Sequence, residues 1–189
     1  MLRTATYSRL FFLSCFFGMT ALLSACVNDL ESIRKVTFKA DDPDEKTSEL
    51  FMTYTDSGYA RIRVYAKLAE SFTLPQPVIK FKDGVRVEFY NEDGKLSSIL
   101  TALYGEINET DGKMLVRDSV QLFNPIKDQR METEVLYWNQ KDSTIFTDKM
   151  VMIRTPKSLL FGTGVRTRQD FSSYTFLKPR GKIDIEENK

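Results

Sequence analysis

Residues 61–68 read Arg-Ile-Arg-Val-Tyr-Ala-Lys-Leu, with an apolar side chain at every second position. Successive side chains of a strand point to opposite faces, so Ile62, Val64, Ala66 and Leu68 share one face and mostly polar groups share the other. This period of two predicts a β-strand that packs on a core with one face and meets water with the other.

The same pattern recurs further along the chain. Val85, Val87 and Phe89 alternate between Asp83-Gly84 and Asp93-Gly94, two turn dipeptides whose glycines can adopt positive φ. Short alternating stretches separated by turn residues are typical of strands and hairpins rather than helices. The sequence therefore predicts an all-β chain with antiparallel neighbours.

A weak internal repeat of 31 residues supports a stacked arrangement. Asp111–Leu115 reappears as Asp142–Phe146, and the small residues Ala102, Thr133 and Gly164 also stand 31 positions apart. Such a period indicates successive two-strand units, each of which buries its apolar face only when its neighbours cover it. The expected architecture is an elongated, antiparallel two-sheet roll.

The first 25 residues are predicted to be an export signal. Arg3 and Arg9 precede the apolar run Leu10–Leu23, whose 14 residues are short for a bilayer span, which needs about 20. A permanent membrane-spanning helix is the alternative. The run ends in Leu23-Ser-Ala-Cys26, which resembles the lipobox of bacterial lipoproteins and implies cleavage before Cys26 and acylation of its thiol. Two or three acyl chains on one residue would make a lasting membrane anchor.

The rest of the chain divides by composition. Residues 26–49 are polar and highly charged and are predicted to be an acylated N-terminus followed by a linker, although Leu30 and Ile33 would also suit a short helix near the membrane. Residues 50–183 carry the strand pattern, and residues 184–189 are a charged tail. Removal of the signal leaves 164 residues, enough for one domain with a sizeable core.

Charge and residue types argue against several functions. Loss of the signal changes the formal net charge from +1 to −1, which gives nucleic-acid binding no electrostatic support. The chain contains no histidine, the commonest general base and metal ligand, so neither an enzyme nor a metal or cofactor site is expected. Glu132 and Glu134 are interpreted as solvated surface residues, and Gly162–Gly164 lacks the third glycine of a dinucleotide site. An envelope enzyme working through carboxylates or tyrosines is the minor alternative.

Several stretches follow one another in a characteristic order: Tyr54–Gly58, Gly84–Tyr90 with Asp93–Lys95, Met131–Gln140, Ile145–Lys149, Gly162–Gly164 and Gln169–Phe171. In order and spacing they resemble the LptC family, the periplasmic bridge component of the lipopolysaccharide export ABC transporter, in its lipid-anchored Bacteroidota-type form. The resemblance implies a twisted β-jelly-roll, open along one side. It also implies a non-catalytic role at the periplasmic side of the inner membrane. Lipopolysaccharide would come from the permease subunits of the ABC transporter and pass to a downstream bridge protein of similar fold.

The alternating faces supply the predicted lipid groove: Ile62, Val64, Ala66, Leu68, Val85, Val87, Phe89, Leu100, Ala102, Tyr104, Met131, Thr133, Val135 and Tyr137. Alternation looks the same in a close-packed sandwich core, so a filled core in a protein-binding scaffold lipoprotein is the alternative. Residues 50–54 are the expected upstream edge strand, and residues 159–169 and 173–177 the expected downstream edge. The basic residues between Arg154 and Lys182 are either a solvated face or a region that attracts lipid phosphates.

Overall fold

The computed structural model describes residues 42–56 and 58–184. The predicted signal peptide, Cys26 and the linker as far as residue 41 lie outside the described residues, as does the tail from residue 185. The described residues from Pro43 onward belong to one unit. Its strands are β1 (Glu45–Asp56), β2 (Tyr59–Phe72), β3 (Val78–Tyr90), β4 (Leu96–Ala102), β5 (Tyr104–Asn108), β6 (Lys113–Asn124), β7 (Gln129–Asn139), β8 (Thr144–Arg154), β9 (Ser158–Arg168) and β10 (Tyr174–Asp184).

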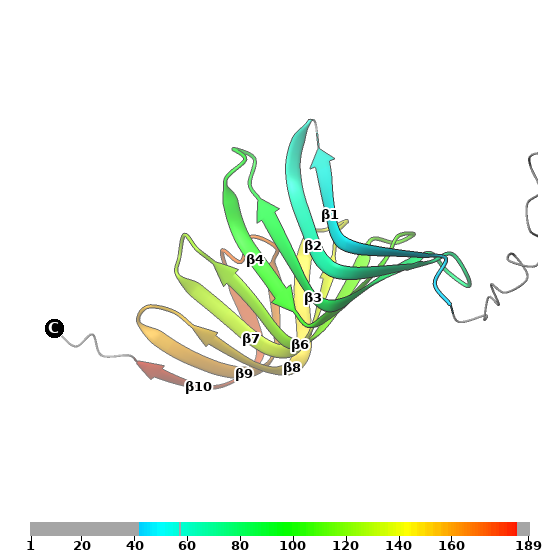
Figure 1. Cartoon of the computed structure of the whole chain (residues 1–189). Helices are drawn as coiled ribbons and strands as arrows, with labels where there is room; N and C mark the ends of the chain where they lie inside the picture. Colours follow the sequence, from blue (N-terminus) through cyan, green and yellow to red (C-terminus); the bar gives the residue numbers. More distant parts are fainter. Residues whose placement is uncertain (1–41, 57, 185–189) are drawn as a thin grey trace, which may run out of the picture. The chain divides into compact units, whose positions relative to one another are not determined.

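All ten strands belong to one antiparallel sheet with the order β1-β2-β3-β4-β6-β7-β8-β9-β10 (Figure 1). β5 pairs with β3 and β6, the same neighbours as β4, so β4 and β5 are two halves of one strand line interrupted at Leu103. Because every connection is a hairpin between neighbours or a continuation, the sheet follows chain order from one edge to the other.

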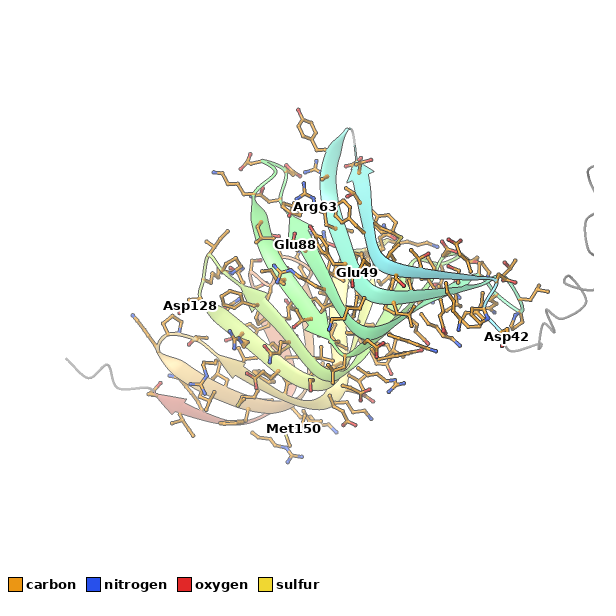
Figure 2. The ribbon with its side chains drawn as sticks, viewed as in Figure 1. Asp42, Glu49, Arg63, Glu88, Asp128 and Met150 are labelled. Atoms are coloured by element: carbon orange, nitrogen blue, oxygen red, sulfur yellow. The ribbon has the colours of Figure 1, made fainter. Side chains whose placement is uncertain are left out.

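One line of irregular positions crosses the strands and bends them. This line, called the crease below, includes left-handed backbone at Glu49, Asp83-Gly84, Asp118-Ser119 and Gly164, and the strand registers shift beside it in β2–β3, β6–β7, β7–β8 and β8–β9. Bulges of this kind bend a strand and increase its twist. Figure 1 shows β1, β2 and β3 bending together, and Figure 2 places Glu49 at the bend of β1.

The crease folds the sheet into two facing layers. The first layer contains the turns β1–β2, β3–β4, β6–β7 and β8–β9, and the second layer contains β2–β3, β5–β6, β7–β8 and β9–β10. Phe89 of the first layer meets Trp138 of the second edge to face, with ring centroids 5.2 Å apart. The hydrophobic core therefore lies between the layers, and the side away from the crease, called the mouth below, is where their turns face each other.

The sheet does not close on itself. β1 pairs only with β2 and β10 only with β9, so each leaves one edge unpaired among the described residues. The predicted all-β, twisted antiparallel jelly-roll is confirmed. The 31-residue repeat has a structural basis, since Ala102, Thr133 and Gly164 all stand at or beside the crease, on β4, β7 and β9.

Candidate functional site

Most of the predicted groove residues lie in the interior of the roll. Those that point inward are at most 6% exposed: Ile62, Val64, Ala66, Val85, Val87, Phe89, Leu100, Ala102 and Met131. All of them belong to the first layer, where their strands run in register from β2 to β7. The structure thus brings these side chains together on one continuous apolar face.

Four predicted residues do not lie on that face: Leu68, Tyr104, Val135 and Tyr137. They come after the crease, in the second layer, and their side chains point outward. In β2 the inward positions Ala66 and Ala69 are three residues apart, so the alternation resumes one residue out of phase and Leu68 turns away from the core. A slip of one residue moves every later side chain to the other face. Tyr137 is accordingly 37% exposed and stacks on Phe146.

Thr133 stands at the crease itself. It is in register with the buried Val120 and Val151, and its hydroxyl donates a hydrogen bond to the Met150 carbonyl at 2.9 Å. It is only partly buried, so it contributes to the end of the inward face rather than to its centre.

The second layer supplies an inward face that the sequence reasoning missed. Its buried apolar side chains are Ala69, Ile79, Phe81, Ile107, Met114, Val116, Leu136, Trp138, Ile145 and Val165. Each strand alternates within the second layer as well, but the bulge at the crease shifts the phase of this alternation by one residue, so the pattern of the first layer does not carry over. Trp138 is 1% exposed, and its indole Nε1–H has no hydrogen-bond partner among the described residues.

Both ends of the interior are less well covered than its middle. At the β1 end, Leu50, Met52 and Tyr54 pack on the core but are only partly buried. At the β10 end, Tyr174 and Phe176 do the same, with their rings 5.9 Å apart. The apolar interior therefore extends to both unpaired edges of the sheet.

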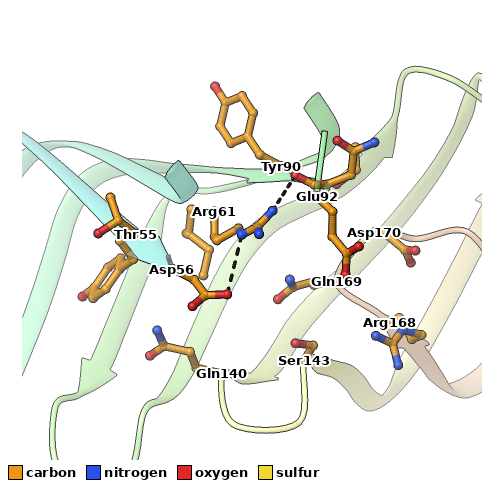
Figure 3. A pocket seen from close by; sticks show the side chains of 14 residues that line it. Thr55, Asp56, Arg61, Tyr90, Glu92, Gln140, Ser143, Arg168, Gln169 and Asp170 are labelled. Atoms are coloured by element: carbon orange, nitrogen blue, oxygen red, sulfur yellow. Dashed lines mark hydrogen bonds and ion pairs between the residues drawn. The ribbon is translucent and has the colours of Figure 1, made fainter. Parts of the chain in front are cut away.

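A polar cavity of about 500 Å³ lies at the mouth, between turns of the two layers (Figure 3). From the first layer, Arg61 donates to the Asn91 carbonyl at 2.9 Å and lies 3.9 Å from the Asp56 carboxylate. From the second layer, Gln140 and Arg168 face them across the cavity. The core residue Ile62 also lines this cavity, so the inner wall of the cavity borders the apolar interior of the roll.

Three tyrosines of the roll have a raised pKa, which favours the neutral phenol form. Burial raises the pKa of Tyr54 at the β1 end, and the nearby Glu109 carboxylate adds to the shift. Burial also raises the pKa of Tyr174 at the other end. On the outer face, burial and a hydrogen bond to Glu106 raise the pKa of Tyr104 to about 12. A general base near pH 7 needs a pKa close to 7, so these phenols are suited to hydrogen bonding and packing.

Fold and interior together define the class: an open, two-layered antiparallel β-roll whose apolar interior reaches two free sheet edges. A family model described as "Lipopolysaccharide-assembly, LptC-related" matches residues 15–179. The chain therefore belongs to the LptC family, and with that family it takes part in lipopolysaccharide transport. LptC-family proteins sit at the periplasmic side of the inner membrane.

No curated protein matches the chain. Within residues 42–56 and 58–184, no helix is long and apolar enough to cross a membrane.

Proposed function

We propose that the roll is a non-catalytic conduit that passes the acyl chains of lipopolysaccharide along its interior. The observation that carries the proposal is the apolar interior, which both layers line and which reaches the β1 edge and the β10 edge. A chain of a dozen carbons costs on the order of 10 kcal/mol to expose to water, at about 0.8 kcal/mol per CH₂. An interior that is apolar from end to end offsets this cost during passage.

The two free edges provide the connection to partners. A strand of another protein can add to an unpaired edge through main-chain hydrogen bonds, which would join two interiors end to end. β1 would face the permease subunits of the inner-membrane ABC transporter, and β10 would face a downstream bridge protein of similar fold. Lys178-Pro179-Arg180 occupies part of β10, so pairing there would use the stretch before it.

Anchoring is proposed to depend on Cys26, which lies outside the described residues. Its acylation, after removal of the signal peptide, would hold the roll at the periplasmic side of the inner membrane. The linker beyond it would let the roll reach the transporter without a spanning helix.

Cross-linking from the inner and outer faces tests the conduit. A small diazirine amino acid replaces Val87, which is fully buried, or Tyr137, which points outward, in the full chain in membranes supplied with ATP. Irradiation should cross-link lipopolysaccharide at position 87 and leave position 137 unlabelled. Absence of lipopolysaccharide at position 87 would show that the interior carries no lipid.

A scaffold lipoprotein that binds only protein is the second candidate. It is favoured by the tight burial of Val87, Phe89 and Leu122, each 0% exposed. In that case cross-linkers on the edge strands would capture proteins while those in the interior captured nothing.

A further inference from the structure

The connection between β9 and β10 crosses the mouth of the roll. Residues 169–173, called the strap below, leave the second layer, where Gln169 N–H donates to the Ser143 carbonyl at 2.9 Å and Phe171 N–H to the Arg168 carbonyl at 2.9 Å. Their carbonyls are bound by side chains of the first layer. The strap therefore bridges the side of the roll that lies opposite the crease.

Side chains of β4, β6 and β7 and of the β6–β7 turn hold the strap. Ser98 Oγ donates to the Gln169 carbonyl, and Asn124 Nδ2 donates to the Asp170 carbonyl at 2.9 Å. Gln129 Nε2 donates to the Phe171 carbonyl and Lys127 Nζ to the Ser172 carbonyl.

Three of these donors are buried polar residues: Ser98 is 0%, Asn124 4% and Gln129 6% exposed. Buried polar groups without a partner cost free energy, and in each case the strap supplies the partner. Because these contacts come from side chains, the strap can leave the first layer without breaking the sheet ladder.

Phe171 fills apolar space beneath the strap. It is fully buried, belongs to the core and lies 5.8 Å from the Tyr174 ring, centroid to centroid. Its backbone has φ +46°, a left-handed conformation that is unfavourable for a bulky side chain. Strain of this kind persists only where the surroundings impose it, and it concentrates in functional segments. The polar cavity of the mouth adjoins the strap through Gln169 and Asp170.

We propose that the strap is a lid and that Phe171 occupies, in the closed roll, the place of a lipid acyl chain. When the strap moves away from the first layer, the space that the Phe171 ring had filled accepts the acyl chain. The side-chain amides of Asn124 and Gln129 and the hydroxyl of Ser98 then donate hydrogen bonds to oxygen atoms of the same lipid. This pairing of an apolar space with several donors fits an acylated sugar, whose ester and amide carbonyls lie next to its chains. The inference rests on the proposed conduit function and adds to it the point of lateral access.

Hydrogen exchange of the wild-type full chain, with and without lipopolysaccharide, tests the lid directly. Lipopolysaccharide should speed amide exchange in a peptide spanning residues 168–174 at least tenfold and slow exchange in a peptide spanning β3. Slowed exchange in β3 with no change in residues 168–174 would overturn the lid and leave the conduit intact. No change in either peptide, together with no cross-link at Val87, would overturn both.

A substitution at the ring gives a second test. Phe171→Ala removes the side chain that competes with the acyl chain, so lipopolysaccharide capture from Val87 should rise several-fold. Phe171→Leu keeps an apolar side chain there and should stay near wild type. Phe146→Ala removes an outward ring, 39% exposed, and is the matched control. Equal capture by the Phe171→Ala and Phe146→Ala variants would contradict the lid, and the exchange measurement decides the matter if Phe171→Ala does not fold.

Discussion

Gly162 shows how a single residue determines the packing of an edge strand. A Cβ atom at this position would lie 2.3 Å from Cδ1 of Phe176 and 3.0 Å from the Lys178 carbonyl oxygen. Because Gly162 has no side chain, the Phe176 ring of β10 can pack against β9 at the less covered end of the interior.

Gly162→Ala should therefore lower the free energy of unfolding by about 1–3 kcal/mol, the usual cost of an overpacked contact. The matched control is Gly181→Ala on β10, where a Cβ would meet nothing within 4 Å. Urea unfolding of both variants checks the prediction. Equal stability of the two would show that β10 does not depend on this contact.

Gly164, one of the small residues of the 31-residue repeat, must be small because of its backbone angle and its neighbour on β10. It has φ +72° at the crease, and a Cβ there would lie 2.8 Å from Leu177. The repeat itself could be read from the sequence. The requirement for glycine could not, because it comes from a neighbouring strand in the folded chain and from a backbone angle that no local pattern marks.

At the scale of elements, Glu70 joins the first three strands. Its carboxylate lies 2.6 Å from Lys82 Nζ of β3 and 3.3 Å from Lys46 Nζ of β1, and its side chain is 7% exposed. The hydrogen bond and charge of Lys82, with those of Lys46, hold the pKa of Glu70 below its ordinary 4.5 despite burial. This ion cluster therefore fastens the edge strand β1 to the sheet.

A carboxyl whose pKa is lowered on folding adds stability above its unfolded pKa and loses it as the pH falls through the folded value. Glu70→Gln should thus destabilise the roll by about 1–2 kcal/mol at pH 7, and the difference from wild type should shrink below pH 4.5. Lys46→Gln should cost less, since the Lys46 side chain is 61% exposed. Urea unfolding at pH 7 and pH 3.5 gives the measurement, and a difference that stays constant with pH would contradict the ion cluster.

The strands themselves could be predicted in outline, but the phase of their alternation across the crease could not. Around Val85 and Val87, within the first layer, the predicted inward positions are the buried ones. Beyond a bulge such as Lys67 the inward face moves by one residue, and nothing in Ala-Lys-Leu marks that shift. For this reason the first-layer lining was found and the second-layer lining, Trp138 included, was missed.

Protein partners should meet the two edge strands. In the full chain in membranes, cross-linking residues at Thr53 of β1 and Thr175 of β10 should capture two different proteins. Arg117, exposed on the central strand β6, should capture neither and is the matched control. Capture of the same proteins at Arg117 as at the edges would contradict edge pairing.

At the scale of the whole molecule, one sheet makes both walls of the interior. The first strand forms one end, the last strand forms the other, and the crease turns each long strand from one wall into the other. Alternation and the 31-residue repeat predicted an elongated antiparallel roll of two sheets, whereas the two walls belong to one ten-stranded sheet. The same strands form both walls because residues with left-handed backbone, such as Asp118 and Ser119, bend them at the crease.

Passage through this interior is most directly tested at its two ends. Cross-linking residues at Val64 of β2 and Val165 of β9, both buried, report on lipid near the β1 end and the β10 end of the full chain in membrane vesicles. On addition of ATP, lipopolysaccharide should be captured at position 64 first and at position 165 afterwards. Capture at neither position, or capture that does not depend on ATP, would contradict the account.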